Sequence, residues 1–111
     1  MAEVEARTRQ FIDAINQRDW QTVAALVTPT TVHRYTGGEA TGADGIIGLY
    51  TMLCEQMGWK ITVNAMTSAG DWVATLHTNT FTDGAFEVCT SGRFDGDRVA
   101  ELWTVGMPPL S

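Results

Sequence analysis

The first half of the chain has the hydrophobic spacing of amphipathic helices. Apolar positions repeat every three to four residues and predict a first helix over about residues 2–17. Asp19 can cap a short second helix that ends before Pro29. Residues 30–35 favour a short strand, and a third helix is expected from Thr41 or Gly42 to Gly58.

From Trp59 onward the hydrophobic period changes to two, which is typical of strands. Four strands are predicted, at residues 59–68, 72–81, 85–94 and 98–106. Short turns rich in Asp and Gly connect them, so neighbouring strands should be antiparallel. Helices followed by such a meander predict an α+β fold, in which a curved sheet wraps around the three helices of the N-terminal half. We expect a cone whose open mouth can hold a pocket.

Composition narrows the class of protein. The 111 residues fit a single domain, residues 1–111. Thirteen acidic residues against seven basic ones give a net charge of −6, which argues against nucleic acid or an anionic membrane as a partner. No apolar run could span a bilayer and the first ten residues lack a signal core, so a cytoplasmic protein is expected. His33 and His77 are isolated from the cysteines, so no metal site is predicted.

Three local motifs cover the domain. Residues 11–19 are similar to an aromatic-x-x-A-x-N-x-x-D opening, and Gly42 with Ile46 fits a G-x-x-x-I helix start. Residues 93–103 are close to an R-x-x-D-G-x-I-x-E-x-W ending. With these motifs the chain resembles the nuclear transport factor 2-like superfamily, and within it the SnoaL-like polyketide cyclases and ketosteroid isomerase. The resemblance implies the cystatin-like α+β roll of that superfamily, but it does not specify a reaction.

Glu101 is the first candidate catalytic residue. Alternation along the last strand groups it with Val99, Trp103 and Val105, and the resemblance puts this set on the pocket side. A carboxyl group buried there would have a raised pKa and could act as a general acid or base. The alternative is that Glu101 pairs with an arginine and has a structural role.

His33 and Tyr35 are the other catalytic candidates. Alternation places both on one face of the first strand and Arg34 on the other. Relatives often carry a catalytic acid or base on this strand, an aspartate in ketosteroid isomerase. A histidine titrates near neutral pH and suits proton transfer. The alternative is a solvated strand edge.

The remaining pocket residues are expected from the resemblance and from strand alternation. Phe11 stands where the family has a tyrosine and Thr90 where the isomerase has an acid, so the isomerase constellation is not reproduced. Thr78 is expected to face the pocket, while His77 would point towards a partner subunit; a register slip of one would exchange the two faces. The predicted ligand-binding residues are Phe11, Tyr50, Trp72, Thr78, Thr90 and Trp103.

The leading hypothesis is therefore an enzyme with an apolar pocket. It would carry out cofactor-free acid–base chemistry, such as isomerisation, cyclisation, hydration or dehydration, on a small hydrophobic molecule. The resemblance suggests a polyketide-, terpenoid- or steroid-like substrate. The alternative is a non-catalytic ligand-binding or dimerisation module. A homodimer through the outer sheet face is expected, because that face is predicted to be too apolar to be simply solvated. The residues expected on it are Val73, Thr75, His77, Phe81 and Leu102.

Overall fold

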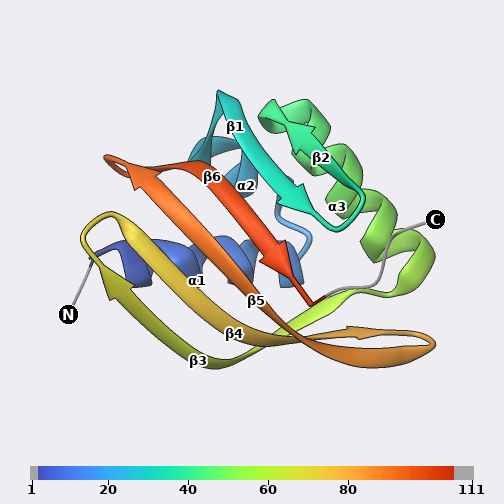
Figure 1. Ribbon diagram of the computed structural model, residues 1–111. Helices are drawn as coiled ribbons and strands as arrows, with labels where there is room; N and C mark the ends of the chain where they lie inside the picture. The colour runs from blue at the N-terminus through green and yellow to red at the C-terminus, as the bar shows by residue number, and fades with distance from the viewer. Residues whose placement is uncertain (1–2, 107–111) are drawn as a thin grey trace.

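Three helices and one six-stranded sheet make up the computed structural model, which describes residues 3–106 (Figure 1). The helices are α1 (Glu3–Asn16), α2 (Trp20–Leu26) and α3 (Gly42–Met57). The strands are β1 (Val27–Tyr35), β2 (Gly38–Thr41), β3 (Lys60–Ala69), β4 (Trp72–Phe81), β5 (Gly84–Asp95) and β6 (Arg98–Val105). The predicted α+β class is confirmed. Strand β2 was not predicted, because its four residues carry no hydrophobic alternation.

The helix ends follow the predicted signals. Asp19 caps α2: its carboxylate accepts hydrogen bonds from the backbone N–H of Thr22 at 3.2 Å and from the Thr22 hydroxyl at 2.7 Å. Gly58 ends α3 with φ of 68°, and its N–H donates to the carbonyl of Cys54 at 3.2 Å. That left-handed conformation costs a residue with a Cβ more than it costs glycine. No helix in the described part of the chain is both long and apolar enough to cross a membrane.

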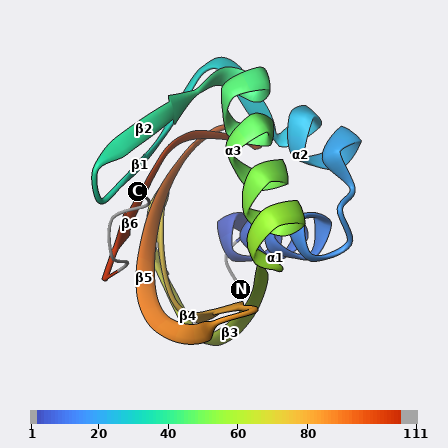
Figure 2. The same cartoon turned by 90° about the vertical axis from the view of Figure 1, so that its right-hand side faces the viewer.

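The sheet is curved and unclosed, with strand order β2-β1-β6-β5-β4-β3. Strands β1 and β6 are parallel neighbours, and the other pairs are antiparallel. Figure 2 shows the sheet curling around α1 and α3, which lie on its concave side. The pairing of β1 with β6 sets His33 beside Leu102, although 69 positions separate them in the sequence. The core and the site both lie between this concave face and the helices.

The end of α1 is tied to the edge strand β3. The Asn16 amide donates to the carbonyl of Ile61 at 2.8 Å and accepts from its N–H at 2.9 Å. Arg18, with φ of 59°, donates from its guanidinium to the carbonyl of Trp59 at 2.7 Å. These bonds give a structural role to the Asn of the aromatic-x-x-A-x-N-x-x-D motif. They fix where Trp59 enters the core.

A bulge in β6 changes which residues face inward. Arg93 pairs with Glu101 and Phe94 pairs with Val99, so Ala100 is an extra residue on β6. An extra residue interrupts strict alternation. Val99 therefore faces inward together with residues 102 and 104, and Glu101 faces outward. The predicted grouping of Val99 with Glu101 and Trp103 is wrong for this reason.

The two faces of β4 are also the reverse of the prediction. Val73, Thr75, His77 and Asn79 are buried on the concave side, whereas Trp72 and Leu76 are about 40% exposed, at 42% and 40%. The prediction assumed that the larger apolar side chains face the pocket. Instead the concave face takes polar side chains that find partners there. All five residues assigned to the outer face lie on this inner side; they are Val73, Thr75, His77, Phe81 and Leu102.

Candidate functional site

A cavity of about 80 Å³ lies between the helices and the concave face of the sheet. Its helical wall is mainly apolar, with Phe11 and Ile15 from α1 and Leu53 from α3. Thr8 and Tyr50 add two hydroxyl groups to that wall. Its sheet wall carries most of the polar side chains, which include His33, Thr75, His77, Asn79, Thr90 and Thr104. Among the described residues, no Asp, Glu, Lys or Arg lines it. The cavity is therefore uncharged except for what its two histidines can acquire.

A chain of four hydrogen bonds crosses this cavity wall. The Tyr50 hydroxyl lies 2.6 Å from Nδ1 of His33, and Nε2 of His33 lies 2.8 Å from the Thr104 hydroxyl. The Thr104 and Thr90 hydroxyls are 2.8 Å apart. The Thr90 hydroxyl lies 2.8 Å from Nε2 of His77. Side chains from α3, β1, β6, β5 and β4 are thus joined into one continuous network.

Burial keeps both histidines neutral. Desolvation, together with a smaller contribution from the nearby His77, lowers the pKa of His33 to about 4. Desolvation also lowers the pKa of His77, while the Asn79 side chain opposes this effect. The same burial raises the pKa of the Tyr50 hydroxyl. At neutral pH each imidazole carries one proton, and Tyr50 remains a phenol.

Two buried nitrogen atoms of the cavity wall lack a hydrogen-bond partner in the described part of the chain. Within residues 3–106, neither Nδ1 of His77 nor Nε1 of Trp59 has a hydrogen-bond partner within ordinary limits. The Asn79 side chain influences the pKa of His77, but its geometry with Nδ1 falls outside those limits. A buried polar group left unpaired costs about 1–3 kcal/mol. A bound molecule that supplies an acceptor would remove that cost.

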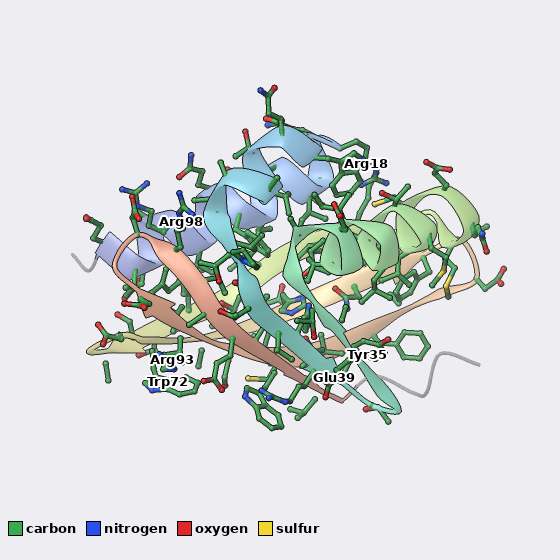
Figure 3. The ribbon with its side chains drawn as sticks, turned by 90° about the horizontal axis from the view of Figure 1, so that it is seen from above. Arg18, Tyr35, Glu39, Trp72, Arg93 and Arg98 are labelled. Carbon is green, nitrogen blue, oxygen red and sulfur yellow. The ribbon has the colours of Figure 1, made fainter. Side chains whose placement is uncertain are left out.

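Several predicted site residues do line the cavity. His33 and Tyr35 share the inner face of β1, as predicted, and Phe11, Tyr50 and Thr90 are also part of the wall. Tyr35 is half-buried and its ring meets the His33 ring edge-on at 6.3 Å between centroids. Figure 3 shows Tyr35 beside Glu39 near the β1–β2 turn. Since Thr36, the next residue along the chain, is exposed, this end of the wall forms the mouth of the cavity.

Glu101 does not lie in the cavity, and its predicted environment is wrong. Its carboxylate accepts hydrogen bonds from Nε of Arg93 and Nε1 of Trp103, both at 2.8 Å, and lies 3.9 Å from Arg34. The bonds from Trp103 and Arg93 lower the pKa of Glu101 instead of raising it. Glu101 is therefore ionised at neutral pH on the outer face, which matches the structural alternative.

The other three predicted ligand-binding residues share that outer face. Trp72 is opposite Arg93 in the β4–β5 ladder, and Figure 3 shows both on the side of the sheet away from the helices. The hydroxyl of Thr78 accepts a hydrogen bond from Asn64 at 2.9 Å. Trp103 is 44% exposed, and the Arg34 guanidinium lies 4.6 Å from its ring centroid. None of the three contacts the cavity.

Sequence reasoning missed His77, Asn79 and Thr104. His77 and Asn79 lie on the same face of β4 as Val73 and Thr75, so one choice of face decides all four. The available signal was His77 itself, a second histidine on a strand that pairs with the strand of Thr90. It was not used, because an isolated histidine on a strand is ambiguous without its cross-strand neighbours.

The comparisons place the chain in a family. The family model described as the SnoaL-like domain matches residues 8–105. The chain belongs to the SnoaL-like domain family. No curated protein sequence matches it significantly. Within residues 3–106, no group of three or more His, Cys, Asp or Glu side chains is placed to hold a metal ion.

Solved structures share the fold of this SnoaL-like domain at low identity. A proposed ketosteroid isomerase from Kribbella flavida is 19% identical, with a TM-score of 0.83 over 97% of this chain and 83% of that chain. A proposed SnoaL-like polyketide cyclase from Shewanella putrefaciens is 18% identical, with a TM-score of 0.84 over 94% and 89%. An epoxide hydrolase of the LEH-like type from M. tuberculosis is 20% identical, with a TM-score of 0.81 over 92% and 80%. These likenesses confirm the predicted superfamily fold.

Proposed function

We propose that this SnoaL-like domain is an enzyme that moves protons on a small neutral molecule without a cofactor. The observation that carries the proposal is the largely buried hydrogen-bonded chain from Tyr50 through His33 to His77 in the wall of a cavity without Asp, Glu, Lys or Arg among its described residues. Burying two imidazoles costs desolvation energy, and within residues 3–106 Nδ1 of His77 has no hydrogen-bond partner to offset that cost. Isomerisation, cyclisation, hydration and dehydration all need such groups.

His77 is the proton-transfer group that contacts the substrate in this proposal. His33, with its pKa near 4, is too weak a base to hold a second proton at neutral pH. It therefore stays neutral and links Tyr50 to Thr104 by hydrogen bonds. A neutral imidazole can polarise a carbonyl by donating its N–H, as known for other isomerases. Tyr35 at the mouth and Phe11 on the opposite wall would position the substrate.

The substrate is uncharged and compact. No charged side chain of the described wall could neutralise a carboxylate, phosphate or ammonium group, and an unpaired charge would be strongly disfavoured there. The cavity, at about 80 Å³, is smaller than the roughly 150 Å³ that holds benzene elsewhere, so a ring of that size, cyclopentanone included, would also occupy the open mouth. A polyketide-, terpenoid- or steroid-like molecule would enter only if the mouth beside Tyr35 and Thr36 widened.

The test is proton exchange at the carbon next to a small ketone. Cyclopentanone incubated with the protein in deuterated water should exchange its α-hydrogens faster than in buffer, as followed by proton NMR. His77→Gln should remove this acceleration, whereas Glu101→Gln should retain it. Binding of cyclopentanone without any accelerated exchange would instead support the non-catalytic ligand-binding alternative.

We also propose that two copies of the chain associate through the outer sheet face. Trp72, Leu76, Trp103 and Val105 lie on this face and are 40% exposed or more. The register sets Leu76 and Val105 in one row across Cys89, so the exposed apolar groups are contiguous. Monomeric proteins rarely expose contiguous apolar patches of this kind. Such a homodimer leaves the cavity free on the other side of the sheet.

A further inference from the structure

The hydrogen-bonded chain restricts where its protons can lie. Each link from Tyr50 to His77 needs one hydrogen between its two heavy atoms. Between Thr104 and Thr90 one hydroxyl therefore donates and the other accepts. Within the described residues, neither hydroxyl makes a further hydrogen bond. Each threonine must then donate once and accept once along the chain.

This restriction couples the tautomers of the two histidines. If Thr104 donates to Thr90, Thr104 must accept from Nε2–H of His33, and Thr90 must donate to Nε2 of His77. His33 then carries its proton on Nε2 and His77 carries its proton on Nδ1. If every hydrogen bond ran in the opposite direction, both histidines would carry their protons on the other ring nitrogen. Equal tautomers would leave a hydroxyl hydrogen without an acceptor, or two acceptors facing each other, either of which is disfavoured.

Tyr50 sets the direction of the chain. Its buried hydroxyl has His33 as its only hydrogen-bond partner among the described residues, so its hydrogen points to Nδ1 of His33. Every following link then donates in the same direction, and the last proton rests on Nδ1 of His77.

We propose that His33 and His77 are held as opposite tautomers, Nε2–H on His33 and Nδ1–H on His77, and that the cavity ligand is a neutral hydrogen-bond acceptor such as a ketone. The ligand oxygen accepts the Nδ1–H of His77. The ligand class rests on the proposed function, because it assumes that the cavity binds a ligand. The tautomer assignment does not.

Complete proton transfer along the hydrogen-bonded chain releases one proton at the His77 end and takes one up at the Tyr50 end. When the Nδ1 proton of His77 passes to the ligand oxygen, Nε2 of His77 takes the Thr90 proton, Thr90 takes that of Thr104, and Thr104 takes the Nε2 proton of His33. Nδ1 of His33 then takes the Tyr50 proton. Because burial disfavours a Tyr50 phenolate, the Tyr50 oxygen must take a proton from the ligand in the same step, so the protein ends neutral with both tautomers reversed. The protein thus takes up one proton for each that it gives.

The tautomers can be measured without any ligand. Long-range ¹H–¹⁵N correlation of the imidazole rings in the ¹⁵N-labelled protein near pH 7 reports which ring nitrogen carries the proton. We expect Nε2–H for His33 and Nδ1–H for His77. Thr104→Val has nearly the same shape but no hydroxyl, so it should abolish the coupling and give mixed tautomers. Thr78→Val on the outer face is the control and should leave both tautomers unchanged. Equal tautomers in the unmodified protein would overturn the assignment.

Two probes of the same ring size test the ligand class. Cyclopentanone should shift the Nδ1–H resonance of His77, whereas cyclopentane, which lacks the oxygen, should not. His77→Phe should weaken cyclopentanone binding about 10-fold and leave cyclopentane binding unchanged. Binding of cyclopentanone without an effect at Nδ1 would overturn the ligand class. If neither probe binds, the proposed function fails together with the ligand class, while the tautomer measurement still decides the assignment.

Discussion

The two faces of one sheet treat polar side chains in opposite ways. On the concave face of β4, β5 and β6, His77, Thr90 and Thr104 are linked to each other and shielded from water, and both imidazoles of the chain are kept neutral. On the outer face of the same strands, Glu101 is held ionised by Arg93 and Trp103. Adjacent positions on one strand therefore lie in different electrostatic environments, one desolvated and the other in contact with solvent.

This difference shows that acid–base capacity depends on the face as well as the residue type. A carboxylate that already accepts two hydrogen bonds in a partly exposed cluster has little tendency to take up a proton at neutral pH. An imidazole in an apolar wall remains neutral and can still donate or accept. The proton-transfer candidates of the SnoaL-like domain are therefore the histidines of the concave face, and Glu101 belongs to the surface.

The largest difference between the concave and outer faces is expected when one polar group is removed from each. His77→Gln should lower the rate of cyclopentanone α-exchange by about 10²–10⁴-fold, the usual contribution of a general acid–base group. Glu101→Gln should change it by less than about twofold, because that carboxylate is outside the cavity. Exchange kinetics by NMR give both values. An equal loss in the two variants would contradict the separation of the faces.

The outer face can be tested by its association. Leu76→Glu introduces a charge into the exposed apolar row and should weaken dimer formation at least about 100-fold, since a symmetric interface contains the change twice. Light scattering at micromolar concentration measures the mass. Phe86→Glu is the control: Phe86 is also 41% exposed but pairs with Asn79 on the other face, so the mass should not change. A monomeric unmodified protein would refute the dimer.

The concave face should make stability depend on pH. The folded pKa of His33, near 4, is below its unfolded value of 6.5, so its contribution is present above the unfolded pKa and is lost as pH falls. Between about pH 7 and about pH 5 the free energy of unfolding should fall by about 2 kcal/mol from His33, and His77 shifts it in the same direction.

Urea unfolding at the two pH values measures this loss. Most carboxylates stay ionised over that range, so they add little to the change. His33→Gln removes the titrating group and should flatten the dependence, leaving the smaller part due to His77. A dependence equally steep in His33→Gln would show that His33 is not desolvated in the folded protein.

The smallest effect is expected for the ion pair on the outer face. Arg93 is 40% exposed and Glu101 24% exposed in their side chains, so solvent screens their attraction. Arg93→Gln should reduce the free energy of unfolding by no more than about 1 kcal/mol. Urea unfolding near neutral pH gives this value, and a larger loss would mean that the cluster around Glu101 is structurally more important than its exposure indicates.

Local signals were enough to predict most of the fold. Asp19, Gly58 and the Asp-Gly turns act on residues close to them in the chain, so their effects can be inferred from neighbouring positions. The family motifs then related the elements to a known architecture. Strand β2 was missed, because its pairing with β1 depends on a turn instead of a hydrophobic pattern.

The site was harder to predict, because it depends on which face each strand presents. The extra residue Ala100 turned Glu101 outward and Thr104 inward, and no local property of the sequence marks that bulge. The link from Tyr50 to His77 joins five elements distant in sequence. Residue type and the family resemblance therefore indicated His33 and Thr90 as candidates but could not connect them to His77.

The Asn16 amide also affects how copies of this protein can meet. An edge strand with free N–H and C=O groups can template a further strand from another molecule, the first step of many aggregates. At Ile61 both groups on the free edge of β3 already bond to Asn16. A strand added from another chain would have to break these bonds before it could continue along β3. At Ile61 the edge of β3 therefore offers no free pair of backbone groups to an incoming strand.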